Sequence, residues 1–270
     1  MAILSAEAVG MRVHAGWFAE FADRWIYVFM AALFFATVLT GFIPTSMQKL
    51  AAVAAGERMP LPGFMHFHAF MMGTWITLLL VQTTLMATGK KGWHMKLGLV
   101  SVAVAPAVLV SMVGVTGATF TQLATLPAGV MPAEALSDVK FFLSNILLEQ
   151  IREVLLFPAF IIWALLVRRE DPEMHKRLII IATLPLLSAA IDRVTWLPST
   201  LPASPASMYI TQLLWLAPVL IYDLWRRGRL HRAYVIGIGL NLPFMLFSYL
   251  SWGTDWWLAT APTIFGIQRW

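Results

Sequence analysis

The sequence predicts an all-α integral membrane protein with about seven transmembrane helices. Hydrophobic residues make up 59% of its 270 residues and charged residues only 12%, which lies outside the range of soluble domains. A bilayer core about 30 Å thick takes roughly 20 apolar residues per helix, so each long apolar stretch predicts one span. Seven such stretches follow one another, at residues 25–43, 64–87, 94–118, 139–167, 172–196, 207–225 and 233–252.

The two ends of the chain predict surface segments. Residues 1–24 mix charged side chains with aromatic ones such as Trp17 and Phe21. This pattern is typical of an amphipathic helix along the membrane interface, and not of a signal peptide. The membrane domain then covers residues 25–252. Residues 253–270 are rich in tryptophan, which prefers the headgroup level, so this tail predicts an anchor on the outer membrane surface.

The second to fifth spans predict two related hairpins. His94 opens one span after a basic turn, and His175 stands 81 positions later, after a second basic turn. In the same register, Glu149 stands 81 positions after His68. Potential ligands at equal spacing predict a central pseudo-twofold four-helix bundle that holds a cofactor or metal site. The two repeats cover residues of about 64–118 and 139–196.

The basic residues predict the orientation of the spans. The short loops 88–96, 168–177 and 226–232 are rich in Lys and Arg, whereas the opposite side has few, spread over longer stretches. The positive-inside rule therefore predicts a cytoplasmic N-terminus and an outer C-terminus. The pI of about 9.7 follows from this loop bias. A lipid bilayer is the expected partner, and nucleic acid is not.

Ionisable residues within the spans predict a polar site near the outer face. Each such group costs several kcal/mol in the bilayer core unless it is paired or faces a cavity. Glu149, Arg152 and Glu153 fall on one face of a helix. Three predicted helices bring polar side chains to the same outer level, namely His66, His68, Glu149, Arg152, Glu153, Asp192 and Arg193.

One interpretation of this outer cluster is a metal site. His68, Glu149 and Glu153 would supply imidazole and carboxylate ligands for a divalent metal such as zinc, iron or manganese, and nearby methionines would suit copper. His66 could join His68 only on an irregular helix, because residues two apart point about 200° apart.

The alternative is a buried salt-bridge network, in which Arg152 pairs with the two glutamates and Asp192 pairs with Arg193. A polar substrate pocket or a proton path would use the same residues. In that case the arginines would bind an anionic substrate or tune the pKa values of the carboxyl groups, and Glu149 or Glu153 would carry a proton.

The inner histidines, His94 and His175, predict a haem site. Each lies in the first turn of its span, and Asp171-Pro172 is a strong start signal for the second of these helices. Two opposed histidines are the usual axial ligands of a low-spin b-type haem. Gly98, one turn after His94, would allow a flat ring to approach closely. Alternatively, each histidine bonds to loop backbone or to lipid phosphate.

The same residues resemble a group of bacterial multi-pass membrane proteins of unknown function. The resemblance covers roughly residues 64–193, and it implies a bacterial inner-membrane location and a site, but no established reaction. The motifs that carry it are His66-x-His68-Ala, Gly89-Lys-x3-His94-x2-Leu97-Gly98 and Asp171-Pro-x2-His175-Lys-Arg-Leu.

The topology is more distantly similar to that of diheme transmembrane cytochrome b proteins, in which four helices place two histidine pairs at opposite membrane faces. His94 and His175 match the inner pair. The chain departs from that pattern at Glu149, which stands where the outer partner of His68 would be. The resemblance therefore implies an inner haem and leaves the outer haem without its second ligand.

Several functional classes lack their signatures. The last span has no lysine for a retinal, and the chain has no phosphate-binding loop, dinucleotide fingerprint or hydrolase motif. The absence of cysteine excludes disulfides, iron–sulfur ligation and thiol catalysis. The leading hypothesis is a haem- or metal-binding membrane redox protein. A transporter or carrier of a metal or small molecule, and an accessory subunit that binds other membrane subunits, are the alternatives.

Overall fold

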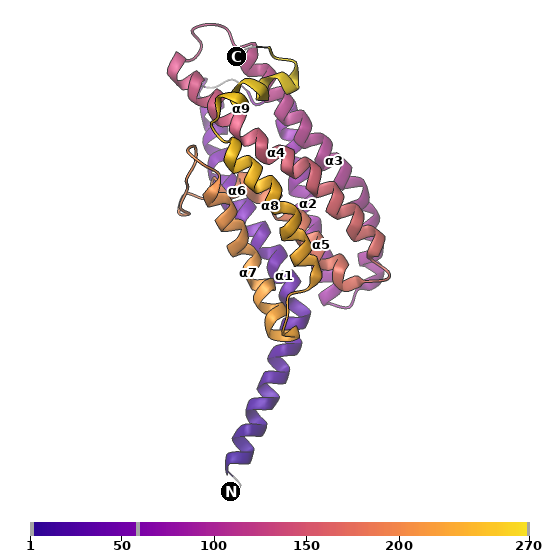
Figure 1. The fold of residues 1–270 in the computed structure, drawn as a ribbon. Helices are drawn as coiled ribbons and strands as arrows, with labels where there is room; N and C mark the ends of the chain where they lie inside the picture. The colour runs from indigo at the N-terminus through magenta and orange to yellow at the C-terminus, as the bar shows by residue number, and fades with distance from the viewer. Residues whose placement is uncertain (1–2, 58–59, 269–270) are drawn as a thin grey trace.

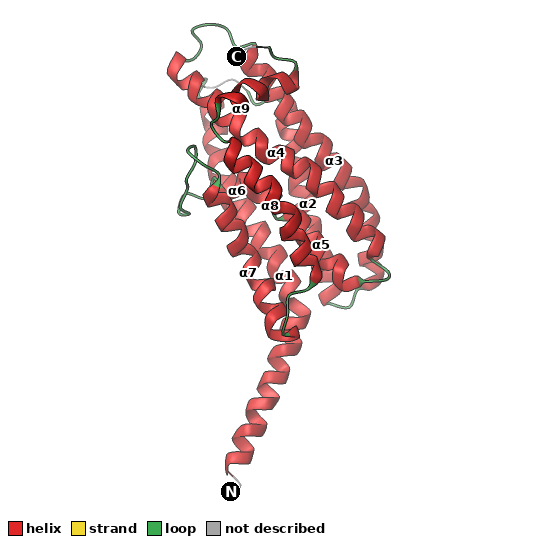
Figure 2. Ribbon diagram, viewed as in Figure 1, coloured by secondary structure: helices red, strands yellow, loops and turns green. Residues whose placement is uncertain are grey.

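The computed structural model describes residues 3–57 and 60–268, with side chains from residue 16 onward (Figure 1). This part of the chain contains helices, turns and no strand (Figure 2). It includes seven segments that are long and apolar enough to cross a membrane, which confirms the predicted all-helical fold and is compatible with a membrane protein. The spans are α1 (Ile3–Ala54, apolar from Gly16), α2 (Gly63–Ala87), α3 (Lys91–Ala124), α4 (Ala133–Val167), α5 with α6 (Pro172–Thr183 and Ser188–Ile191), α7 (Ala206–Arg227) and α8 (Arg232–Ser251).

Helix α1 continues through the boundary predicted at residue 24. Its N-terminal part extends away from the bundle, and the two chain ends lie at opposite ends of the molecule (Figure 1). Trp17 and Phe21 stack with ring centroids 5.7 Å apart, and Phe18 lies 5.5 Å from the ring of Trp225 on α7. The side chains of Glu7 and Arg12, part of the predicted amphipathic pattern, lie outside the described residues.

The fifth span is broken, although the sequence predicts one segment over residues 172–196. Helix α5 ends at Thr183, a 3₁₀ turn covers Pro185–Leu187, and α6 covers Ser188–Ile191. Proline has no backbone N–H, and its ring crowds the preceding turn, so the α-helical hydrogen bonds are interrupted there. Prolines in α1, α3, α4, α7 and α8 are accommodated inside continuous helices.

This broken span lies at the centre of the bundle. In its apolar stretch of 18 residues, 78% of the residues are buried inside the protein, a larger share than in any other described span. Helices α1, α4, α7 and α8 pack around the segment from α5 to α6, and the α2–α3 hairpin packs against α1 and α4. Helix α1 approaches α6 closely at Gly41, where a Cβ atom would lie 2.2 Å from the carbonyl oxygen of Ala190. Only glycine fits this contact.

The tryptophan-rich tail packs largely against the protein. Helix α9 (Asp255–Thr260) lies beside the N-terminal half of α4. Trp252 and Trp257 are buried, and their indole nitrogens donate to the carbonyls of Pro202 (2.8 Å) and Ser144 (2.7 Å). Trp256 is exposed, whereas Trp270 lies outside the described residues. The predicted membrane anchor is therefore limited to the exposed part of the tail, because the buried indoles of Trp252 and Trp257 bond to the bundle instead.

Candidate functional site

The charged residues near the middle of α4 form a buried polar cluster with α7 and α8, deeper than the outer level predicted from the sequence. Arg152 is 1% exposed, and its guanidinium lies 2.7 Å from a carboxylate oxygen of Glu149, which is equally buried. The hydroxyl of Tyr209 on α7 donates to the other oxygen of Glu149. The salt-bridge interpretation thus describes Glu149 and Arg152 correctly, because an arginine buried in a membrane bundle requires such a partner.

Two neutral amides complete the surroundings of Arg152. Its guanidinium donates to the side-chain oxygens of Gln212 on α7 (3.4 Å) and Asn241 on α8 (3.3 Å). Gln212 in turn donates to the hydroxyl of Ser188 on α6 (2.8 Å), and Asn241 donates to the carbonyl of Gly237 (2.8 Å). Because the amide N–H groups are bonded elsewhere, both amide oxygens are held toward the arginine.

Glu153 lies beside this pair without joining it. Its side chain is buried, and its electrostatic neighbours are Arg152, Glu149 and the hydroxyl of Ser188. None of the ion pairs in the described part of the chain includes Glu153. The cluster thus contains two carboxyl groups and one guanidinium.

Asp192 and Arg193 lie apart from the Glu149 pair. Burial raises the pKa of the Asp192 carboxyl, and the nearby Arg193 charge opposes that rise. Burial likewise lowers the pKa of Arg193, whose guanidinium lies over the ring of Phe42 at 5.0 Å. Among the described contacts, no hydrogen bond or ion pair connects either residue to Glu149, Arg152 or Glu153. The predicted Asp192–Arg193 ion pair is not among the ion pairs of the described residues, and the predicted outer cluster is only partly assembled.

The predicted metal ligands are not gathered at one point. His68 is half-buried, with Nδ1 3.1 Å from the hydroxyl of Ser111 on α3. Helix α2 is regular from Gly63, and His66, two residues away from His68, is exposed. Within the described ranges, no group of three or more His, Asp or Glu side chains could hold a metal ion. The metal site therefore stays a prediction, and the described residues show no group of ligands for it.

The inner histidines come from different helices and lie close together. His94 is in the first turn of α3 and His175 in the first turn of α5, and the two rings are near enough to interact electrostatically. Asp171 caps α5 by accepting the backbone N–H of Met174 (2.8 Å), with Pro172 at the first position. The predicted start of this helix is confirmed.

Each inner histidine contacts one backbone carbonyl. His175 places Nδ1 2.8 Å from the carbonyl oxygen of Ala164 on α4, and His94 lies against the backbone of Gln82 on α2. The Nδ1 atom of His94 is buried and has no hydrogen-bond partner among the described residues, and the same holds for the side-chain oxygen of Gln82. Gly98 lies beside Gln82, whose amide nitrogen would be 3.7 Å from an added Cβ.

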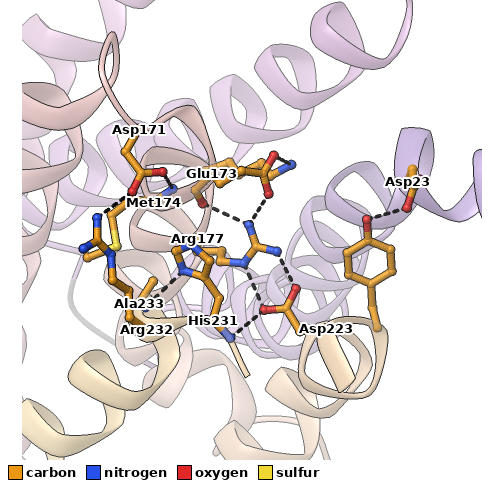
Figure 3. A network of polar contacts seen from close by, with 11 residues as sticks. Asp23, Asp171, Glu173, Met174, Arg177, Asp223, His231, Arg232 and Ala233 are labelled. Atoms are coloured by element: carbon orange, nitrogen blue, oxygen red, sulfur yellow. Dashed lines mark hydrogen bonds and ion pairs between the residues drawn. The ribbon is translucent and has the colours of Figure 1, made fainter. Parts of the chain in front are cut away.

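A second polar network joins α1, α5, α7 and α8 at the end of the bundle that carries the basic loops 168–177 and 226–232 (the end predicted to be inner), and sequence reasoning missed it (Figure 3). Arg177 on α5 is buried and pairs with Asp223 on α7 and with Glu173 one turn earlier. The backbone N–H of His231, before α8, donates to Asp223 (3.0 Å). The sequence signal for this network is Asp223, an acidic residue inside the apolar segment 207–225. Arg177 gives no such signal, because it falls within the basic loop 168–177.

The periphery of this inner network extends to α1 and α8. Asp23 on α1 accepts from Tyr222 (2.7 Å) and pairs with Arg226 (2.7 Å), both on α7. Asp171 pairs with Arg232 (2.8 Å). The Met174 N–H, followed by the Arg232 side chain, lowers the pKa of Asp171.

Comparisons with family models, with curated proteins and with solved structures found no match to this chain. The candidate sites are therefore defined by their own geometry.

Proposed function

We propose that the protein binds a b-type haem between His94 and His175 and carries electrons near the inner end of the bundle. The observation that supports this most directly is the pairing of two partly buried imidazoles from different helices. Each ring contacts one backbone carbonyl, and no described hydrogen bond uses the other ring nitrogen. Two such nitrogens are what the axial positions of a b-type haem require.

The hydrogen bond to the Ala164 carbonyl favours the ligand form of the His175 ring. A ring nitrogen that bonds to a carbonyl must carry the hydrogen, so the opposite nitrogen keeps its lone pair. Metal-binding histidines are held in this way by a second partner, which fixes the tautomer and the ring orientation. The buried, unpartnered Nδ1 of His94 is the orphaned atom that a bound group would satisfy.

Basic residues around the pair suit an acidic cofactor. Arg168 interacts electrostatically with His175, and Lys90 and Lys91 precede His94. These cations would pair with haem propionates, and the protein would hold and orient the group by these contacts. When bound, a haem would supply reversible one-electron chemistry.

The visible spectrum tests this proposal. Protein purified in detergent is expected to show a Soret band and an alpha band that sharpens on reduction with dithionite. His94→Ala and His175→Ala are each expected to lose or shift both bands. His68→Gln, which changes a half-buried histidine near the other end of the bundle, is the matched control and should leave them unchanged. A colourless folded protein, or bands that survive both alanine substitutions, would contradict the proposal.

A carrier of a small molecule or metal is the second candidate. The observation in its favour is the break at Pro185, because discontinuous helices often form substrate sites in transporters. The broken span passes Ser188, which contacts the Glu149–Arg152–Glu153 cluster. This candidate predicts a colourless protein whose ligand uptake into liposomes is lost in Arg152→Gln. An accessory role, with other membrane subunits as partners, is the remaining alternative.

We further infer a bacterial inner-membrane location with the three basic loops in the cytoplasm and the C-terminus outside. Support comes from the loop bias and from the chain ends, which lie at opposite ends of the bundle (Figure 1). Because the chain has no cysteine, Lys90→Cys and Ala128→Cys are clean probes. A membrane-impermeant thiol reagent added to intact cells should label only Cys at position 128. The reverse pattern would invert the topology. The pseudo-twofold relation between residues 64–118 and 139–196 stays part of this proposal.

A further inference from the structure

The turn of α4 from Glu149 to Glu153 places three ionisable groups deep inside the bundle. Glu149 and Arg152 are each 1% exposed, and Glu153 is 8% exposed. Asn241, which accepts from Arg152, lies near the middle of α8 (Arg232–Ser251). The cluster therefore lies near the middle of that span. It is far from both ends, and so from the water that would stabilise a charge there.

Among the described ion pairs, the guanidinium of Arg152 pairs only with Glu149. The two side chains meet at 2.7 Å, and the Tyr209 hydroxyl donates to the same carboxylate. Gln212 and Asn241 add neutral oxygens on the arginine side. These contacts all stabilise an ionised Glu149 and a charged Arg152, so the pair is neutral as a unit.

Glu153 faces this neutral unit as an additional carboxyl group. The groups packed toward it are Glu149 and Arg152 on α4 and the Ser188 hydroxyl on α6, with Tyr209 and Gln212 on α7 and Asn241 on α8 arranged around the arginine. All other charges in the cluster are already paired. As a carboxylate, Glu153 would leave one net negative charge in the membrane interior, beside the Glu149 carboxylate. As a carboxylic acid it leaves none, and it gains an O–H donor. An uncompensated buried charge is strongly unfavourable, and such a group takes up a proton instead.

The Nε atom of Arg152 gives a second, independent observation. It is buried and has no hydrogen-bond partner in the described part of the protein. Unpaired N–H groups inside a sealed cluster are rare, since each costs desolvation. None of the described hydrogen bonds of Arg152 goes to Glu153, so that carboxyl group stays outside the ion pair even though one N–H of the guanidinium is unpaired.

We propose that Glu153 is a proton-binding site in the membrane interior, held as the neutral acid by the Glu149–Arg152 pair beside it. Binding converts the Glu153 carboxylate and one proton from water into a carboxylic acid, and release returns that proton and leaves one negative charge in the cluster. The inference does not rest on a cofactor at the histidine pair.

Infrared spectroscopy of the whole protein in liposomes tests this directly. The wild type at neutral pH should show the C=O band of a protonated carboxylic acid, shifted by exchange into deuterated water. Glu153→Gln should lose that band, whereas an Asp138→Asn variant, which changes a carboxyl group near the outer end of α4, should keep it. A wild type without the band, or a band that persists in Glu153→Gln, would overturn the proposal.

The stability of paired variants gives a second, separate measurement. An amide closely mimics a neutral carboxylic acid, so Glu153→Gln should leave the melting temperature in detergent within about 2 °C of the wild type. Glu149→Gln removes the partner of a buried arginine and should lower it by roughly 10 °C. Equal losses in the two variants would mean that Glu153 is ionised and paired, contrary to the proposal.

Discussion

Arg152 and Arg177 are equally buried, at 1% exposure each, yet their surroundings differ. Arg177, near the inner face, pairs with Asp223 and with Glu173, whose side chain is 44% exposed and also pairs with Lys176 at 2.6 Å. Arg152, in the interior, pairs with Glu149 alone and otherwise meets neutral amides. Around Arg177, two cations (Arg177 and Lys176) meet two anions (Asp223 and Glu173), and the partly exposed Glu173 reaches solvent.

The comparison separates a structural role from a chemical one. At the inner face, paired charges connect the ends of α1, α5, α7 and α8 (Figure 3). Such contacts stabilise the packing of the helix ends. In the interior, an additional carboxyl group remains beside a satisfied pair. Polar groups retained at such a cost in the membrane interior are functional by default. We therefore expect substitutions in the inner network to change stability, and substitutions at Glu153 to change proton uptake.

The largest expected effect is at Asp223, which pairs with the buried Arg177. Asp223→Asn removes the partner of a fully buried arginine and should cost about 3–5 kcal/mol in unfolding free energy. The measurement is chemical unfolding in mixed detergent micelles. Asp23→Asn, which breaks an exposed pair with Arg226, is the control and should cost several-fold less. Similar losses of unfolding free energy in the two variants would show that burial does not make the Arg177–Asp223 pair more stabilising than the exposed Asp23–Arg226 pair.

An intermediate effect is expected for two tyrosines that donate to carboxylates. Tyr209 donates to the buried Glu149, and Tyr222 donates to the exposed Asp23 at 2.7 Å. Tyr209→Phe leaves a buried acceptor short of one donor and should cost about 1–3 kcal/mol, while Tyr222→Phe should cost less because water replaces the phenol. The same unfolding assay compares them. A larger loss in Tyr222→Phe would place the more important network at the inner face.

The smallest expected effect is a pH dependence at His231. Its Nδ1 caps α8 by accepting the N–H of Ala233 at 3.1 Å, which only the unprotonated ring can do. Burial, followed by the positive charges of Arg177 and Arg227, lowers its pKa. A lowered folded-state pKa contributes stability above the ordinary value of about 6.5, and this is lost as pH falls. The melting temperature should therefore drop between pH 7.5 and 5.5 by roughly 2 °C more in the wild type than in His231→Asn. Parallel curves would exclude this role.

The sequence predicts the spans well because apolar length is a local property. Charged residues on one face of α4 and the start of α5 at Asp171-Pro172 are also local features, and the structure has both. The partners of Arg152 could not be predicted in the same way. Tyr209, Gln212 and Asn241 are uncharged residues in spans, and only packing of α7 and α8 against α4 brings them to the arginine.

The break in the fifth span shows a second limit of sequence reasoning. Pro185 interrupts its helix, whereas Pro158 and Pro243 lie inside continuous helices. The residue type is the same in all three places, so local sequence does not distinguish them. At Pro185 the chain forms a 3₁₀ turn, which packs among α1, α4, α5 and α6. The carbonyl of Pro185 accepts from the Ser188 hydroxyl at 2.6 Å.

The buried central span has a mechanical consequence. His175 lies at one end of this 20-residue segment and Ser188 lies near the other, so a single stretch of chain touches both candidate sites. Surrounding helices shield it from lipid over most of its length. Because this one stretch of chain carries residues of both candidate sites, a displacement of the central span would move the two sites together.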